Sequence, residues 1–239
     1  MRFDQSEFDL RCEWGEHGVS ELAPACEVVI IVDVLSFTTS VDIATNQGAQ
    51  VFPYRWQDES AAAFAASVNA QVAQAKRDAP GYSLSPASLL RIPKGTRLVL
   101  PSPNGATLTL AAGETPTLAG CLRNARAVAA AARQYGRRIG VIPAGERWPN
   151  GSLRPAFEDL VGAGAILSYL SGEASPEARA AVAVYQGARP SLAQSLKACG
   201  SGKELIERGF ERDVVLASEL DVSACVPVLV NGAYVRIAA

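Results

Sequence analysis

The stretch "VVIIVDVLSFTTSVDIA", residues 28–44, decides the fold of this chain. Residues 28–33 form a continuous apolar run that ends on Asp33, a pattern typical of a strand buried on both faces of a sheet. Hydroxyl side chains follow, and a helix is expected from about Thr38 to just before Gly48, a residue suited to a helix C-terminus. The stretch therefore predicts a buried strand, a polar turn and a helix, which is the repeating unit of an α/β fold.

The same alternation continues along the chain. Pro53 places the second strand near a sheet edge, because proline cannot donate a backbone hydrogen bond. Asp58 is expected to cap a long helix that runs to about residue 78, and the Asn231-Gly232 pair is expected to turn a C-terminal hairpin. Further strands are predicted at 50–55, 97–102, 117–122 and 139–145, a helix at 124–136, a loop at 80–96, and helices at about 155–171, 176–186, 190–198 and 203–219. We predict a three-layer α/β/α sandwich with a largely parallel or mixed central sheet. The domain is predicted to cover residues 1–239 and to be rich in helix from about residue 153.

Composition excludes several classes of protein. The chain has 239 residues, 49 % of them hydrophobic and 19 % charged, which is typical of a globular enzyme. Its net charge of −2, with scattered Lys and Arg, argues against a nucleic-acid partner. No apolar run approaches the ~20 residues of a membrane span, and the acidic N-terminus does not resemble a signal peptide. The five cysteines are odd in number and form no CxxC pair, so we expect neither disulfides nor zinc, and a reducing cytoplasm.

Polar residues follow nearly every predicted strand. In parallel α/β sheets, ligands bind beyond the carboxyl ends of the strands, so these residues are expected to share one edge of the sheet. They are Asp33 after the first strand, Ser102, Asn104 and Gly105 after the third, Arg123 and Asn124 after the fourth, and Glu146, Arg147, Glu158 and Asp159 after the fifth.

The chemistry that these groups support is narrow. Carboxylates suit a hard cation, most often Mg²⁺, which prefers one or two carboxylates and several waters. Hydroxyls and backbone N–H groups at helix N-termini suit phosphate. Arginines such as Arg147 and Arg123 offer planar, bidentate contacts to phosphate or to an acidic substrate. Together they predict metal-assisted transfer or hydrolysis of a phosphoryl group.

Other phosphate chemistries find no support. The chain has no C-x5-R loop and no complete P-loop, and its single histidine, His17, lies in a polar N-terminal segment. A covalent aspartyl-phosphate mechanism of the haloacid dehalogenase type requires an acid two residues after the nucleophile, where this chain has Leu35. Structural interpretations stay open: Asp33 as a helix cap, residues 101–106 as a plain turn, and the acids at 158 and 159 as partners of a helix dipole.

Five blocks in register resemble the 2-phosphosulfolactate phosphatases over roughly residues 25–235. The blocks are VVIIVDVLSFTTSV, PSPNGATL, GCLRNARAVA, AGERWPNGSLRPAFEDLVGAGAI and VPVL. The resemblance implies a three-layer α/β fold and Mg²⁺-dependent hydrolysis of 2-phospho-3-sulfolactate to 3-sulfolactate and phosphate. It also implies a place in coenzyme M biosynthesis where that pathway exists.

The resemblance carries over to single positions and also shows departures. The family's strand-end Asp, Thr-Ser pair, Asn-Gly, helix-opening Asn and paired Asp-Asp match Asp33, Thr38–Thr39, Asn104–Gly105, Asn124 and Glu158–Asp159. Where the family has Arg soon after the Asp, this chain has Ser36, and the Thr-Thr before Asn-Gly is replaced by Ser102-Pro103. A polar family segment is reduced to residues 81–90, and a family His near residues 200–202 is absent.

We therefore predict a cytoplasmic, Mg²⁺-dependent phosphatase for a small acidic phosphoester. It is predicted to bind neither nucleic acid nor membranes, and a homodimer is compatible with the pattern. The alternative is a catalytically lapsed paralogue that binds a small anionic metabolite, since the family's Arg and His are missing. The predicted residues are Asp33 and Glu146 for catalysis, Asp33, Glu158 and Asp159 for the metal, and Thr38, Thr39, Ser102, Asn104, Gly105, Asn124 and Arg147 for the substrate.

Overall fold

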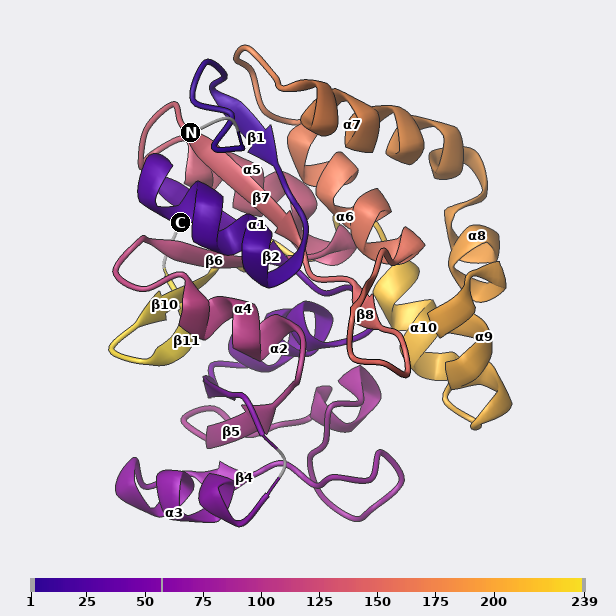
Figure 1. Cartoon of the computed structure of the whole chain (residues 1–239). Coiled ribbons are helices and arrows are strands. Elements are labelled where there is room, and N and C mark those ends of the chain that lie inside the picture. Colours follow the sequence, from indigo (N-terminus) through magenta and orange to yellow (C-terminus); the bar gives the residue numbers. More distant parts are fainter. Residues whose placement is uncertain (1–2, 57, 238–239) are drawn as a thin grey trace.

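A mixed β-sheet runs through the centre of the molecule (Figure 1). The computed structural model describes residues 3–56 and 58–237. Within these residues the sheet has nine strands in the order β1-β7-β2-β6-β10-β11-β3-β5-β4, and β8 and β9 form a separate hairpin. The strands are β1 Leu10–Cys12, β2 Val28–Val32, β3 Gln50–Tyr54, β4 Gln71–Val72, β5 Arg97–Pro101, β6 Thr117–Gly120, β7 Ile139–Pro143, β8 Glu146–Arg147, β9 Leu153–Arg154, β10 Pro227–Val230 and β11 Ala233–Arg236.

The strand β2 is the most enclosed element of the sheet. It pairs in parallel with β6 on one side and β7 on the other, and all five of its residues are fully buried. Ile30 faces one hydrophobic cluster while Ile31 faces another, which explains the continuous apolar run in the sequence. The strand therefore delivers Asp33 to the carboxyl edge of the sheet.

Helices cover both faces of the sheet. The helices α5, α6 and α7 share the hydrophobic cluster around Ile30, and α1 and α4 share the cluster around Ile31. This is the predicted three-layer sandwich, with a mixed sheet because the hairpin of β10 and β11 is antiparallel to its neighbours. The helices are α1 Gly15–Leu22, α2 Phe37–Asn46, α3 Glu59–Ser67, α4 Gly105–Ala111, α5 Ala125–Ala132, α6 Phe157–Leu167, α7 Pro176–Ala188, α8 Leu192–Ala198, α9 Gly200–Glu207 and α10 Glu211–Ser218.

The prediction of one long helix after Asp58 is wrong in its length. Asp58 does cap the helix, since its carboxylate accepts the Ser60 N–H at 3.0 Å, but α3 ends at Ser67. Asn69 then adopts a left-handed backbone with φ of 49°, and the chain turns into β4. The residues after β4 form a loop that brings Arg77 to the carboxyl edge of the sheet.

Other boundaries also differ from the prediction. The strand β3, predicted from Pro53 to lie near an edge, is third from the β4 edge of the sheet, between β11 and β5. Proline is tolerated there because the ladder with β11 consists of the single pair Val51–Tyr234 and does not reach it. The helix expected at 203–219 is two helices, α9 and α10, and the short elements β1, α1, β4, β8 and β9 were not predicted. Among the described residues, no helix is long and apolar enough to cross a membrane.

Candidate active site

Asp33 links the ends of two strands to the beginnings of two helices. Its carboxylate accepts the N–H of Phe37, at the start of α2, at 3.0 Å, and the N–H of Gly105, at the start of α4, at 2.8 Å. Gly105 has to be glycine, because a Cβ there would lie 2.5 Å from the Phe37 ring and 2.8 Å from the Asp33 carboxylate. The carboxylate is thus held in one orientation at the end of β2, and it is buried.

Asp159 makes a second link of the same kind. Its Oδ1 accepts the N–H of Val34 at 2.7 Å and its Oδ2 accepts the N–H of Gly145 at 2.8 Å. These donors follow β2 and β7, so the first turn of α6 is fastened to the ends of both strands. The structure therefore brings together two predicted metal ligands that lie 126 residues apart in the sequence (159 − 33).

Two glutamates complete an acidic cluster with these aspartates. Glu158 is buried in the first turn of α6. Glu146, on β8, accepts a hydrogen bond from the side-chain amide of Asn104 at 2.9 Å. The acidic cluster is defined here as Asp33, Glu146, Glu158 and Asp159.

Burial and mutual repulsion raise the pKa values of three members of the acidic cluster, Asp33, Glu146 and Asp159. Burial raises the pKa of Glu146 to about 7, and the negative charges of Asp33 and Glu158 add to the effect. Burial also raises the pKa of Asp33, against the two backbone hydrogen bonds that favour its charged form. The pKa of Asp159 is raised by burial and by the charges of Asp33 and Glu158. Such a cluster is stabilised by a cation.

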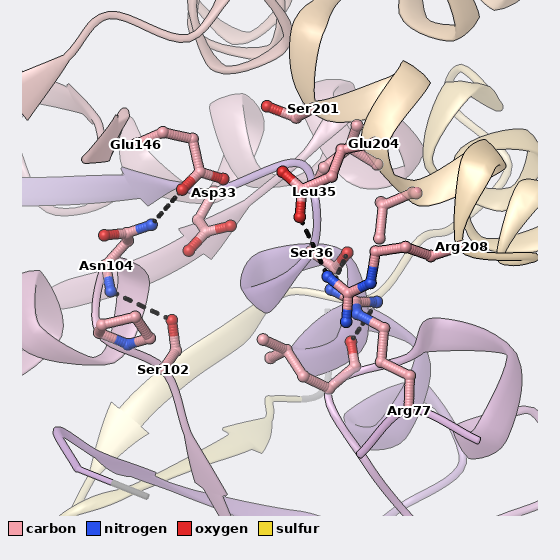
Figure 2. A pocket seen from close by; sticks show the side chains of 13 residues that line it. Asp33, Leu35, Ser36, Arg77, Ser102, Asn104, Glu146, Ser201, Glu204 and Arg208 are labelled. Carbon is pink, nitrogen blue, oxygen red and sulfur yellow. Dashed lines mark hydrogen bonds and ion pairs between the residues drawn. The ribbon is translucent and has the colours of Figure 1, made fainter. Parts of the chain in front are cut away.

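A cavity of about 230 Å³ opens beside the acidic cluster (Figure 2). Asp33, Glu146 and Asn104 line one side of this inner cavity, and Arg77 and Arg208 lie across from them. Glu204 also lines the cavity on the arginine side, where it pairs with Arg208 at 3.0 Å. We call the side with Asp33 and Glu146 the acidic wall and the side with the two arginines the basic wall, an arrangement that suits a phosphate bound between a metal and guanidinium groups.

The sequence analysis missed both arginines of the basic wall, and Arg77 is the more deeply held of the two. Its guanidinium donates to the Ser36 hydroxyl at 3.0 Å and pairs with Asp213 at 3.0 Å. Asp213 is itself buried, and its other oxygen accepts the Ser85 hydroxyl at 2.6 Å. Arg77 was assigned to the long helix, and no local motif marks it. Because α3 ends early, at Ser67, the guanidinium of Arg77 reaches Ser36, the position at which the family pattern has arginine.

The predicted substrate-binding residues divide into two groups by location. Ser102 and Asn104 line the inner cavity, and Gly105 contributes its N–H to Asp33 rather than to the cavity. The hydroxyls of Thr38 and Thr39 donate to the carbonyls of Asp33 and Val34, both at 2.8 Å, and so stabilise the turn before α2.

The other polar residues at the sheet edge lie farther from the inner cavity. Asn124 is fully buried, and its side chain accepts the Cys121 N–H at 2.9 Å in a capping box. Arg123 pairs with Asp42 at 3.1 Å and with Glu219. Arg147 is exposed on the hairpin of β8 and β9 and pairs with Glu16 at 2.6 Å. The substrate contacts predicted for Asn124 and Arg147 stay predictions.

The donor set fits a hydrated divalent cation better than an enclosed protein cage. Within residues 3–56 and 58–237, no group of three or more His, Cys, Asp or Glu side chains could hold a metal ion by itself. Magnesium, however, usually keeps several waters and needs only one or two carboxylates. Both oxygens of Asp33 already accept one backbone N–H, which orients the carboxylate and leaves each oxygen a further lone pair.

Two carboxyl groups, those of Asp33 and Glu146, facing two arginines at the carboxyl edge of an α/β sheet define an enzyme of phosphate-ester chemistry. Comparison with known proteins supports the same class of enzyme. The family model described as 2-phosphosulpholactate phosphatase matches residues 17–232. This chain belongs to the 2-phosphosulfolactate phosphatase family.

Individual relatives support the same assignment. The 2-phosphosulfolactate phosphatase of Methanothermobacter thermautotrophicus is 29 % identical, over 85 % of this chain and 87 % of the relative. The probable 2-phosphosulfolactate phosphatase of Thermus thermophilus is 32 % identical, over 85 % of this chain and 88 % of the relative. That of Deinococcus radiodurans is 28 % identical, over 86 % and 89 %. The resemblance noted in the sequence is thereby confirmed.

Proposed function

We propose that this protein is a Mg²⁺-dependent phosphatase that hydrolyses a small acidic phosphoester, 2-phosphosulfolactate, to 3-sulfolactate and inorganic phosphate. The observation that carries the proposal is the inner cavity, in which Asp33 and Glu146 of the acidic cluster face Arg77 and Arg208 in a member of this family. The five cysteines, all of them free thiols, support our placing the reaction in a reducing cytoplasm.

The phosphate binds in the inner cavity between the two walls. Arg77 donates to its oxygens from the basic wall, and the pairing with Asp213 holds that guanidinium in place. Ser102 and Asn104 offer a hydroxyl and an amide from the opposite side. Asp33, with Glu158 and Asp159 or their waters, holds Mg²⁺, which supplies charge neutralisation of the phosphate and orientation of the attacking water.

Glu146 provides the proton for the leaving group. Burial raises its pKa, to about 7 in the metal-free protein, and so favours the protonated carboxyl that a general acid requires. When water adds to phosphorus and the ester P–O bond breaks, the proton of Glu146 passes to the departing alcohol oxygen. Asn104 keeps the carboxyl in position for this transfer through the hydrogen bond of 2.9 Å.

The test is release of inorganic phosphate from 2-phosphosulfolactate by the purified protein, with and without Mg²⁺. We expect turnover only with the metal, and a loss of at least 100-fold in Asp33→Asn. Asp58→Asn is the matched control. It makes the same change at an exposed helix cap that does not line the inner cavity, and it should keep wild-type turnover. Binding of 2-phosphosulfolactate without any phosphate release would show instead a catalytically lapsed member of the family, and full turnover in Asp33→Asn would refute the assigned site.

A further inference from the structure

A second cavity adjoins the inner one. It has a volume of about 450 Å³ and lies between the start of α1, the helix α4 and the hairpin of β8 and β9. We call it the outer cavity. Asn104 and Glu146 line both cavities, so their hydrogen bond forms part of the boundary between them.

The lining of the outer cavity differs from that of the inner one. Trp14, Leu108 and Leu153 present apolar surface to it. Its charged groups include Arg147 and Glu16, which form an ion pair and are each nearly half exposed. Such an exposed pair is weak, so Arg147 can exchange Glu16 for a carboxylate of a ligand at little cost.

The position of Glu146 sets the orientation of a substrate. If the phosphate lies in the inner cavity and Glu146 protonates the ester oxygen, the alcohol that leaves extends past Glu146 into the outer cavity. A three-carbon acid fills only a small part of that space, which has the size of a pocket for a much larger ligand. The apolar side chains there gain contact only from an alcohol that carries a bulky apolar group.

We propose that the outer cavity binds the alcohol part of the substrate, and that the enzyme accepts phosphoesters of 2-hydroxy acids with a bulky apolar side chain, such as an aryl group. The apolar group packs against Trp14, Leu108 and Leu153, and the carboxylate pairs with Arg147. This inference rests on the proposed function, because it takes the phosphate to occupy the inner cavity.

The kinetic test compares two esters that differ only in side-chain size, 2-phospholactate and 2-phospho-3-phenyllactate, in the presence of Mg²⁺. We expect kcat/KM to be at least tenfold higher for the phenyl ester in the wild type. Trp14→Ala removes an apolar wall and Leu153→Trp fills the cavity, so both should bring the ratio of the two kcat/KM values close to one. Trp148→Ala is the matched control, since Trp148 lies in the same hairpin but lines neither cavity, and it should keep the wild-type ratio.

A binding measurement separates failure of this inference from failure of the proposed function. The chain has three tryptophans, and a variant that keeps only Trp14, with Trp56→Phe and Trp148→Phe, reports directly on the outer cavity. Quenching of its fluorescence should give a Kd for 3-phenyllactate at least tenfold below that for lactate.

The outcomes divide as follows. A wild-type kcat/KM ratio of one or less, with both esters hydrolysed, overturns the inference and leaves the proposed function standing. If 2-phosphosulfolactate is hydrolysed and neither of these esters is, the inference is overturned and the proposed function stands. If none of the three is hydrolysed, the proposed function fails, and binding decides: equal Kd values for the two acids overturn the inference, and selective binding of 3-phenyllactate supports the cavity as its site. Melting temperatures of Trp14→Ala and Leu153→Trp within a few degrees of the wild type exclude misfolding as the reason for a lost preference.

Discussion

The side-chain amide of Asn104 donates a hydrogen bond of 2.9 Å to Glu146, a residue whose pKa burial and neighbouring charges raise to about 7. An amide can bond to either protonation state of the carboxyl, so it orients Glu146 without fixing its charge. The negative charges that raise this pKa belong to Asp33 and Glu158, which we assign to the metal. In the metal-free protein, ¹³C NMR of labelled glutamate should therefore find a carboxyl that titrates near 7, and Mg²⁺ should lower that pKa. A value that does not respond to saturating Mg²⁺ would argue against a metal at the acidic cluster.

The same pKa predicts how stability depends on pH. The folded protein holds the Glu146 proton more tightly than the unfolded chain, whose glutamate has the ordinary value of 4.5. The stabilisation from this proton is therefore complete below about 4.5 and is lost as pH rises through about 7. Glu146→Gln cannot ionise, so at about pH 8 it should raise the free energy of unfolding of the metal-free protein by about 1–3 kcal/mol, and by much less at about pH 5. Chemical denaturation at both pH values measures the difference, and equal effects at the two would contradict the prediction.

The neighbouring acids Glu158 and Asp159 should separate metal binding from folding. Asp159 accepts two backbone N–H groups, and asparagine would turn an NH₂ group toward one of these donors. Asp159→Asn should therefore lower the free energy of unfolding by about 1–3 kcal/mol. Glu158 is buried, and glutamine keeps its size but is a weaker ligand for Mg²⁺ than a carboxylate, so Glu158→Gln should keep the metal-free stability and weaken Mg²⁺ binding at least tenfold. Calorimetric titration with Mg²⁺ and thermal unfolding of both variants measure these effects; the assignment fails if Glu158→Gln binds Mg²⁺ as the wild type does.

The strands and turns that local sequence patterns encode could be predicted from the sequence. The continuous apolar run 28–32 became the buried strand β2, and the Asn231-Gly232 pair became the turn of the last hairpin. It was also predictable that polar residues after different strands meet at one sheet edge, because parallel strands place their carboxyl ends together. Asp33, Glu158 and Asp159 lie together there for this reason. The prediction of one domain over residues 1–239 stays a prediction.

What could not be predicted depends on partners that are distant in sequence. Alanine-rich composition favours helix throughout residues 58–78, yet α3 stops at Ser67 because the chain pairs β4 with β5. That early end moves Arg77 into the site, where its partner Asp213 comes from α10. The hydroxyls of Thr38 and Thr39 illustrate the opposite error, since their pattern resembles phosphate ligands but the turn uses both internally. Sequence shows which groups are present at the edge, and tertiary contacts decide which of them face the cavity.

Arg77 and Asp213 provide a test of the basic wall. Arg77→Met removes the predicted phosphate contact but also leaves Asp213 buried without its cation, which should cost about 3–5 kcal/mol of stability. Adding Asp213→Asn removes that uncompensated charge and keeps an oxygen for the Ser85 hydroxyl, so the double variant should recover much of the stability. Both variants should raise KM for the phosphoester at least tenfold. Steady-state kinetics and thermal unfolding measure the two effects, and a double variant with wild-type KM would exclude Arg77 as a phosphate ligand.

Gly105 tests whether the packing around Asp33 determines activity. An alanine Cβ there would lie 2.5 Å from the Phe37 ring and 2.8 Å from the Asp33 carboxylate, so one of these groups has to move. Because Asp33 accepts the Gly105 N–H, the movement should disturb the orientation of that carboxylate and lower kcat at least 100-fold, with a loss of about 1–3 kcal/mol in stability. Gly187→Ala is the matched control: it lies in α7, an added Cβ meets nothing within 4 Å, and it should stabilise the helix by about 0.5–1 kcal/mol without changing kcat. Phosphate-release kinetics and denaturant unfolding of the two variants distinguish the positions, and unchanged turnover in Gly105→Ala would mean that the orientation of Asp33 does not limit the reaction.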